Sequence, residues 1–480
     1  MKKIRLIFLY LVIISLFGCG KDHSVEVVTP EISDVTVFTS ITKIELSCIV
    51  TYRGDFQLFV RYGEEECCLE KEVEAVNDGS MFSASIDDLD GGHTYYYRFV
   101  VRNQVGEYEF EPGQVVTNSI DVFTKPATYI TFSSADCEVT VNTVSDDDEY
   151  EESGLCWSEQ PSPIVSDHHV VSNSSSAGTF LLRMDGLEAG KTYYARAYVI
   201  KDGQVTYGDE VSFTTFVLPV GAISGVYSVS DRQKICFSQG NLQFKATERA
   251  WRFATNQYDY VGDNNVHISN IYSGWIDLFG WGTSGINHGA ICYQPWSVNQ
   301  QYMDYYAYGN DAFGLYSNDG SADWGANPIS NGGNVAKQWR SLTKDKWVYL
   351  FNTRTTYSGN RFVKAQVNGV NGVMLLPDNW IPSSYELKDY NNNSSSFSSN
   401  IIPISDWENL QRLGVVFLPA AGSRDGLDVH SVGSSGYYWS SSSYDAFYAS
   451  FVSFQNGSLS PLSRDYRYYG QSVRLVQVVE

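Results

Sequence analysis

A gapless internal repeat constrains the fold of this 480-residue chain more than any other feature of its sequence. Residues 82–98 read FSASIDDLDGGHTYYYR, and residues 180–196 read FLLRMDGLEAGKTYYAR. In both copies a Leu precedes a Gly-containing turn, and a Tyr-rich run follows. Side chains alternate across a strand, so Tyr95 and Tyr97 share one face with Phe99. The repeat therefore predicts two related β-rich modules in tandem.

The shared run L-x-x-G-x-T-Y-Y-x-R resembles the tyrosine-corner region of fibronectin type III-like β-sandwiches. The runs GLCWS at 154–158 and VSFTT at 211–215 strengthen this resemblance in the second copy. The resemblance implies two fibronectin III/Ig-like β-sandwich modules, over residues 31–118 and 119–216. We interpret both modules as spacers.

Composition favours a mostly β, globular protein. Hydrophobic residues make up 43% of the chain, which suits packed domains. Short strand-like runs are frequent, and long helical periodicity is missing from the sequence. The formal net charge of -22 argues against nucleic acid as a partner, because phosphates are bound by Lys and Arg.

The N-terminus has the order of a bacterial lipoprotein signal. Basic residues precede an apolar run from Leu6 to Phe17, which is too short to span a bilayer comfortably. The run ends in LFGC, which resembles a lipobox and implies cleavage before Cys19 and lipidation of that residue. We expect a signal peptide over 1–18 and a polar tether over 19–30; an ordinary signal peptide with a chance Cys is the alternative.

The residues that follow Cys19 bear on where the protein resides. Gly20-Lys21-Asp22 resembles the surface-export signals of Bacteroidetes lipoproteins, although the signal here is short. The expected localisation is the outer membrane, with the chain exposed at the cell surface. The expected membrane contact is the lipid on Cys19.

Seven further cysteines leave an odd number, so they cannot all pair within one chain. Cys137 and Cys156 lie on two strand-like runs of one module, so a bridge between them is one alternative. The favoured alternative is that the cysteines are small buried hydrophobic residues. Neither a Cys-x-x-Cys spacing nor a Cys/His cluster is present. The acidic run 146–149 is interpreted as a solvated loop rather than a calcium site.

The C-terminal part, residues 219–480, contains two stretches with helical signals. Thr343 can cap a helix that continues through a run of apolar residues after it. The run 405–408 reads SDWE, which matches a capping box, and Leu410 and Leu413 follow at helical spacing. Gly414 then predicts the end of that helix.

The last fifty residues predict a hairpin and a closing strand. Asn456-Gly457 is a type I′ turn signal, and the run before it is rich in strand formers. Pro461 indicates that the run after the turn is an edge strand or a loop. The alternating residues of 472–479 predict a largely buried final strand.

Six runs of the C-terminal part are similar, in order and spacing, to the "major paralogous" lipoprotein domain common in Fibrobacter and Bacteroidetes. They are VAKQWRSLT (335–343), WVYLFNTR (347–354), VMLLPDNW (373–380), VFLPAAG (416–422), GYYWSS (436–441) and SVRLV (472–476). The resemblance covers roughly residues 223–478 and implies a C-type-lectin-like, formylglycine-generating-enzyme-like fold. It implies two helices, a twisted antiparallel sheet, and a terminal strand that pairs near the start of the domain.

The residues argue against the chemistry of those two relatives. Formylglycine-generating enzymes need a late pair of cysteines for copper, and here no Cys follows Cys292. A lectin calcium site needs oxygen ligands from two short triplets, but 294–296 reads QPW and 407–409 reads WEN in a predicted helix. Asp428 and His430 lack a nucleophile elbow. We therefore expect no enzyme activity, no catalytic residues, no cofactor and no metal.

The segment 437–470 is similar to the variable region of proteins diversified by retroelements, in which Tyr, Ser, Asp, Phe, Asn and Arg occupy ligand-facing positions of a fixed frame. Tyr offers a large, rigid contact area, and Ser and Asn offer adaptable hydrogen bonds. The frame under this resemblance is Trp439, Ala449, Val452, Phe454, Gly457, Pro461 and Gly470. The predicted ligand contacts are Tyr437, Tyr438, Tyr444, Asp445, Phe447, Tyr448, Phe451, Arg464, Asp465, Tyr466 and Tyr469. Ordinary surface residues of a domain with fixed specificity are the alternative.

The sequence thus predicts a mostly β chain: two β-sandwich modules followed by a lectin-like α+β head. The expected function is that of a lipid-anchored cell-envelope protein whose head binds a protein or glycan ligand. A structural or adhesive envelope component without a specific small ligand is the second hypothesis. A formylglycine-generating-like enzyme is the third and the least favoured.

Overall fold

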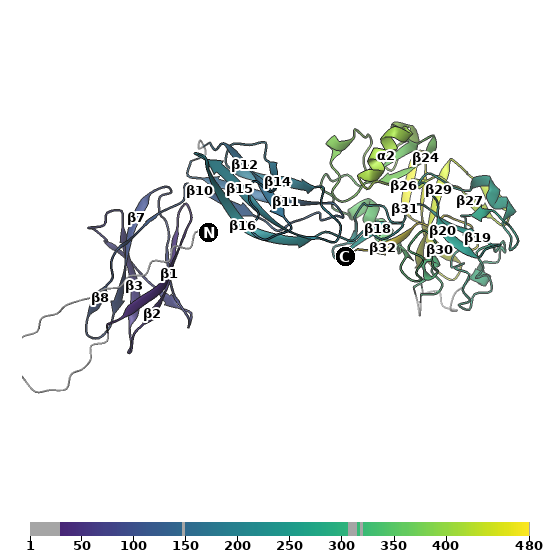
Figure 1. The fold of residues 1–480 in the computed structure, drawn as a ribbon. Coiled ribbons are helices and arrows are strands. Elements are labelled where there is room, and N and C mark those ends of the chain that lie inside the picture. Colours follow the sequence, from purple (N-terminus) through teal and green to yellow (C-terminus); the bar gives the residue numbers. More distant parts are fainter. Residues whose placement is uncertain (1–28, 146–148, 306–313, 317–319, 480) are drawn as a thin grey trace, which may run out of the picture. The chain divides into compact units, whose positions relative to one another are not determined.

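The computed structural model describes residues 29–145, 149–305, 314–316 and 320–479 (Figure 1). The predicted signal peptide over 1–18, the lipidation site Cys19 and residues 146–148 of the acidic run lie outside the described residues. In the part of the chain that is described, no helix is long and apolar enough to cross a membrane.

Strands account for 43% of the chain and helices for 9%, so the prediction of a mostly β protein is confirmed. The chain divides into two compact units. The first contains Met1–Ala127, Asp136–Met184 and Thr192–Phe213, and the second contains Thr128–Ala135, Asp185–Lys191 and Thr214–Glu480.

Two sheets form from the first copy of the repeat and its flanks. One sheet has the order β1 (Glu31–Thr39), β2 (Ile44–Thr51), β6 (Phe82–Ile86), β5 (Val76–Asn77). The other has β4 (Lys71–Glu74), β3 (Gln57–Gly63), β7 (Thr94–Arg102) and β8 (Glu107–Glu109), with β9 (Gly113–Val116) also on β7. Leu46, Val60, Tyr95 and Phe99 pack together in the core of this region, as the alternation in the sequence predicts.

Two further sheets contain the second copy. Their orders are β10 (Ile120–Thr124), β11 (Ser134–Thr143), β14 (Gly178–Asp185), and β13 (His168–Val171), β12 (Glu152–Ser158), β15 (Thr192–Lys201), β16 (Gln204–Thr214). The two copies share several hydrogen bonds at equivalent positions, among them those of one Thr in each copy. Thr117 Oγ1 donates to Asp90 O and Thr215 Oγ1 donates to Glu188 O, both at 2.6 Å. The repeat in sequence is therefore a repeat in local structure.

Most strands after residue 219 belong to small antiparallel sheets. Two four-stranded sheets have the orders β17 (Tyr227–Ser230), β18 (Gln233–Phe237), β32 (Leu475–Val478), β22 (Arg340–Ser341) and β25 (Ile401–Ile402), β23 (Phe362–Val367), β24 (Val370–Leu375), β26 (Val416–Pro419). Two three-stranded sheets have the orders β20 (Ala250–Phe253), β19 (Leu242–Lys245), β21 (Trp275–Ile276) and β29 (Ser435–Ser443), β30 (Tyr448–Gln455), β31 (Ser458–Tyr466). A two-stranded sheet pairs β27 (Ser423–Asp425) with β28 (Asp428–His430). The pair β23–β25 is parallel.

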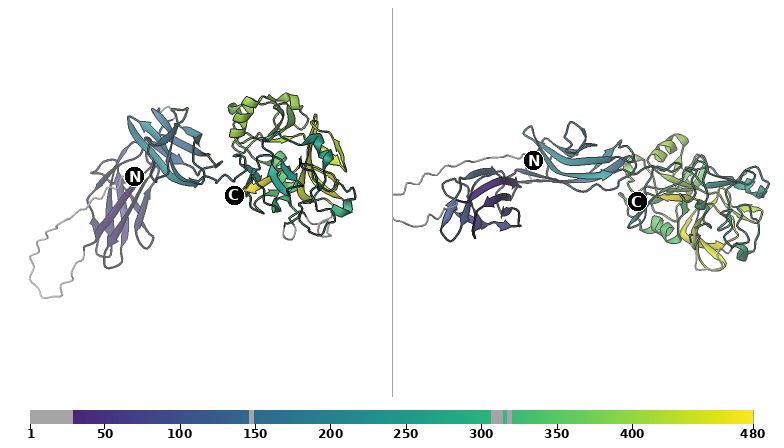
Figure 2. Two further views of the ribbon diagram at one scale, coloured as in Figure 1. Left: turned by 45° about the vertical axis from the view of Figure 1, so that its right-hand side comes forward. Right: turned by 60° about the horizontal axis from the view of Figure 1, so that its bottom comes forward.

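The final strand β32 lies inside its sheet and pairs with β18, where Ile235 is opposite Val478. The prediction that the terminal strand pairs near the start of the domain is confirmed. Figure 2 shows the yellow C-terminal strands among the teal and green segments that precede them.

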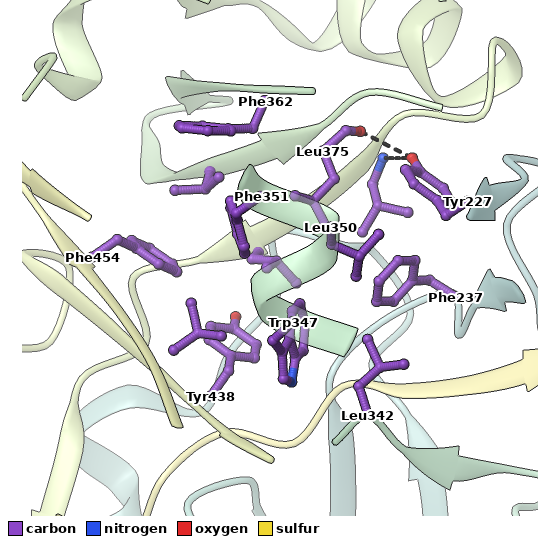
Figure 3. Close-up of a cluster of buried hydrophobic side chains, with 14 of the residues drawn as sticks. Tyr227, Phe237, Leu342, Trp347, Leu350, Phe351, Phe362, Leu375, Tyr438 and Phe454 are labelled. Atoms are coloured by element: carbon purple, nitrogen blue, oxygen red, sulfur yellow. Dashed lines mark hydrogen bonds between the residues drawn. The ribbon is translucent and has the colours of Figure 1, made fainter. Parts of the chain in front are cut away.

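The first predicted helix is confirmed. Thr343 accepts a hydrogen bond from Lys346 N at 3.3 Å and caps α1 (Lys344–Val348), which continues as the π-helical turn η5 (Tyr349–Thr353). Trp347, Leu350 and Phe351 pack into a large hydrophobic cluster (Figure 3). Tyr227 closes one side of this cluster, because its hydroxyl donates to Leu375 O at 2.9 Å and accepts from Val416 N at 3.1 Å.

The second helix, α2 (Ile404–Arg412), begins earlier than the capping box predicts. Pro403 is the N-cap residue and provides no side-chain hydrogen bond, so Ser405 lies inside the helix. The predicted capping box is therefore wrong. Leu410 is buried, but Leu413 is exposed at the C-cap, and Gly414 ends the helix with φ of 85° as predicted.

Short 3-10 turns complete the helical content of the described chain. They are η1 (Gly262–His267), η2 (Tyr302–Tyr305), η4 (Trp324–Ala326), η6 (Pro382–Ser384) and η7 (Phe397–Ser399).

The cysteines of the described residues form no disulfide. Cys137 and Cys156 lie on β11 and β12 in two different sheets, and each is buried with a free thiol, so the bridge that was one alternative does not form. The favoured prediction of small buried residues holds for five of the seven. Cys67 and Cys68 are exposed instead.

Candidate functional site: an aromatic patch at one end of a hairpin

The hairpin of β30 and β31 carries most of the predicted contacts. Asn456 and Gly457 form its turn as predicted, but only Gly457 has a positive φ, 73°, so the turn is not type I′. β31 is the edge strand of its sheet, and Pro461 lies within it beside an irregularity in the register, which confirms the edge position.

The middle of the hairpin is core. Val452 and Phe454 contribute to the cluster around Trp347, while Ala449 and Phe451 contribute to a second cluster that contains Trp439. β30 is therefore buried on both faces. Five of the seven predicted frame residues, Trp439, Ala449, Val452, Phe454 and Gly470, are buried.

This burial corrects two predicted contacts. Tyr438 has 0% of its side chain exposed, and its hydroxyl donates to Pro419 O at 2.9 Å. Phe451 is 6% exposed and packs edge-on against Trp439 with ring centroids 5.8 Å apart. Neither ring can contact a ligand in this conformation, because Tyr438 belongs to the cluster around Trp347 and Phe451 to the cluster that contains Trp439. Tyr437 is half-buried and packs against the second cluster.

The open end of the hairpin brings the remaining aromatic residues together. Tyr448 begins β30 and Tyr466 ends β31, and antiparallel pairing places them opposite each other with ring centroids 4.5 Å apart. Phe447 and Tyr444 lie in the connection just before β30 and are 41% and 49% exposed. We define the aromatic patch as Tyr302, Tyr444, Phe447, Tyr448, Tyr466, Tyr468 and Tyr469, with Arg464.

Tyr302 and Tyr468 are patch residues that the sequence did not predict. Tyr302, from η2, stacks on Tyr466 at 5.9 Å and meets Phe447 edge-on at 4.8 Å. Tyr468 stacks on Tyr466 at 5.4 Å and on Tyr469 at 4.9 Å. Tyr468 belongs to the same Tyr-rich run as the predicted contacts Tyr466 and Tyr469, so the sequence does contain a signal for it. The sequence signal for Tyr302 is a local run of tyrosines, which lies far from the hairpin in the sequence.

Arg464 supplies the cation of the patch. Its guanidinium lies 4.6 Å from the ring centroid of Tyr444 and 5.5 Å from that of Tyr448. Such stacking holds a planar, hydrogen-bonding cation against aromatic faces without burying its charge. The patch therefore offers π faces, phenolic hydroxyls and one guanidinium at the same place.

The carboxylates of the two predicted aspartates accept hydrogen bonds from the backbone beside the patch. The Asp445 carboxylate accepts hydrogen bonds from Phe447 N and Tyr448 N at 2.8 and 2.9 Å, which fixes the turn between β29 and β30. Asp465 accepts from Tyr466 N at 2.9 Å. Burial raises the pKa of Asp465 from 3.8 to about 6, and the charge of Asp425 adds to this shift.

Arg467 holds the connection between β29 and β30 in place. It is buried, and its guanidinium lies 4.7 Å from the centroid of the Trp281 ring. It donates to Ser443 Oγ at 2.8 Å and also to Asp445 O. The connection that carries Tyr444 is thereby tied to a buried tryptophan.

Comparisons with known proteins say little about this site. A family described as "Domain of unknown function (DUF8237)" matches residues 383–476, a stretch that includes every patch residue except Tyr302. The comparison with curated proteins finds no match.

Two solved structures resemble parts of the chain, namely shorter and longer versions of the sensor domain of the anti-sigma factor RsgI4 in Pseudobacteroides cellulosolvens. They are 20% and 21% identical to this chain, cover 21% of it and 98% and 91% of their own chains, and have TM-scores of 0.16 and 0.17. Similarity at this level carries no argument about the function of the chain.

Proposed function

We propose that this chain is a lipid-anchored cell-envelope binding protein whose lectin-like C-terminal domain recognises a protein or glycan ligand through the aromatic patch. The observation that carries the proposal is the grouping of seven aromatic residues and Arg464 at the open end of one hairpin. Tyr and Arg are the residue types enriched at binding hot spots.

The rigidity of the patch supports binding over a purely structural role. Strand pairing, the Asp445 turn and Arg467 hold the rings in place before any ligand arrives. A preformed site loses little conformational entropy on binding. The two triplets that supply the calcium ligands of lectins are missing from the sequence, so we propose that binding needs no divalent cation.

The test is a binding screen of the full mature chain against glycans and envelope proteins, with and without a chelator. The triple variant Tyr444→Ala, Tyr448→Ala, Tyr466→Ala should lose binding, since each central anchor contributes about 2 kcal/mol. Leu462→Ala is the matched control, because Leu462 is 50% exposed on β31 but lies outside the patch. Full binding by the triple variant, or chelator-sensitive binding, would count against this site.

The membrane attachment is tested separately. Cys19→Ala should leave the precursor uncleaved by the lipoprotein peptidase and free of lipid. Normal processing and membrane retention of this variant would contradict the proposed anchor while leaving the patch untouched.

The second candidate function is a structural or adhesive envelope component. The seventeen-residue repeat and its shared Thr hydrogen bond favour a spacer role for the N-terminal modules under either function. Loss of cell adhesion on deletion of residues 31–216, with ligand binding by the head unchanged, would support this candidate.

A further inference from the structure

The loop between β3 and β4 carries the sequence Glu64-Glu65-Glu66-Cys67-Cys68. A hydrogen bond from Cys68 N to Glu65 O, 3.0 Å long, closes a tight turn over its last four residues. The side chains of Glu65, Cys67 and Cys68 are all exposed. Two adjacent thiols and a carboxylate therefore meet at the surface of one turn.

The donor atoms of this turn lie close together. Cys67 Sγ is 2.9 Å from Cys68 Sγ and 3.6 Å from Glu65 Oε2. The three ligand atoms all lie within 4.8 Å of one another. Among the residues that the structure describes, this is the one group of three or more His, Cys, Asp or Glu side chains gathered so tightly.

The turn is held by its strands. Tyr62 pairs with Lys71 across the base of the loop. A Cβ on Gly63 would come within 2.4 Å of Cys68 O, so only glycine allows the backbone of Cys68 to approach this closely. The backbone from which the second thiol projects is thus held in place.

We propose that Glu65, Cys67 and Cys68 form a binding site for a thiophilic divalent cation of the Zn²⁺ and Cd²⁺ class. Thiolates are soft ligands and select such cations over Ca²⁺ and Mg²⁺, which take oxygen ligands. Three protein donors leave one tetrahedral position for water or for a ligand from another molecule. This site revises the sequence-based expectation of no metal, and its signal is two adjacent cysteines with a Glu two residues before them.

Binding must release the thiol protons. A thiol binds such a cation as its thiolate, so the cation competes with a proton for each sulfur. Affinity should therefore increase with pH through the neutral and alkaline range.

The test uses the full mature chain, reduced and free of metal, titrated with Cd²⁺ while the ultraviolet thiolate-to-metal charge-transfer band is recorded. We expect saturation at one equivalent per chain, undisturbed by excess Ca²⁺ or Mg²⁺. Cys67→Ser and Cys68→Ser should each abolish the stoichiometric band. Glu65→Gln should weaken affinity by about tenfold or more, since loss of a carboxylate that only supports a ligand already has an effect of about tenfold at metal sites. Glu70→Gln is the control, a neighbouring carboxylate outside the cluster.

The variants alter exposed loop residues, and an unchanged thermal transition of the metal-free proteins would show that they remain folded. A stoichiometric band that persists in the Cys67→Ser, Cys68→Ser double variant would assign the metal to other thiols and overturn the proposal. Binding only at a large excess of Cd²⁺, or equal loss in Glu70→Gln, would overturn it as well.

Discussion

The two ends of the β30–β31 hairpin are built in opposite ways. At the turn, Lys364 from β23 is fully buried, and its ammonium donates to the carbonyls of Asn393, Ser395, Gln455 and Ser458 at 2.7 to 3.0 Å. At the open end, half-exposed rings stack on one another and on Arg464. Buried polar bonds fix one end, and surface aromatic contacts make up the other.

The two ends of the hairpin therefore differ in how many side chains stabilise them. Three N–H donors are shared among four carbonyls at the turn, so that end depends on a single side chain. The open end distributes its contacts over eight residues, none of which is a buried member of the two hydrophobic clusters. A change of patch residues there should lower the free energy of unfolding little, whereas a change at the turn should lower it much.

The largest expected effect is that of Lys364→Met, which keeps the unbranched apolar stem of the side chain but removes all four bonds to backbone carbonyls. Loss of a charged donor to buried acceptors should lower the free energy of unfolding by about 3 kcal/mol. Urea denaturation of the C-terminal transition measures this. Lys346→Met on α1 is the matched control, since Lys346 is only partly buried. An unchanged midpoint for Lys364→Met would show that the turn is held by something else.

A smaller effect should come from Asp465, at the patch end. Because its pKa is raised from 3.8 to about 6 in the folded protein, its protonated form stabilises the fold below pH 3.8. That contribution is lost as the pH rises through 6. The stability of the wild type relative to Asp465→Asn should therefore fall between pH 4 and 7, by about 1 kcal/mol after allowance for partial solvent screening. A pH-independent difference would contradict this.

The smallest effect concerns the stacked pair Tyr448 and Tyr466. A double-mutant cycle with alanine should give a coupling free energy of unfolding of about 0.5 kcal/mol, as for partly exposed aromatic pairs. In ligand binding the same cycle should give a larger coupling if both rings contact the ligand. Equal coupling free energies in unfolding and in ligand binding would mean that the two rings pack against each other but do not both contact the ligand.

Local signals in the sequence predicted local structure well. The cap at Thr343, the turn at Asn456-Gly457, the stop at Gly414 and the edge position of Pro461 each depend on near neighbours in the chain. The capping box at Ser405 failed because Pro403 allowed the helix to begin earlier. Sequence pattern alone does not decide between two possible helix starts that lie two residues apart.

The site was harder to predict because it depends on tertiary burial. Residue types alone place Tyr438 of β29 and Phe451 of β30 among the ligand contacts, yet each is buried in one of two hydrophobic clusters. Tyr302 joins the patch from a turn more than a hundred residues earlier. The prediction included the patch residues Tyr444, Phe447 and Tyr448 because they lie close together in the sequence around the start of β30, where local pattern is sufficient.

The position of β32 has a consequence for how the protein is made. Residues 475–478 occupy the interior of a sheet whose partner strand, β18, is translated more than two hundred residues earlier. Long-range pairing of this kind slows folding, because the loop must close before the contacts form. The sheet of β17, β18, β32 and β22 therefore cannot be completed until residues 475–478 have been synthesised, so β18 waits for its partner while the more than two hundred residues between them are added.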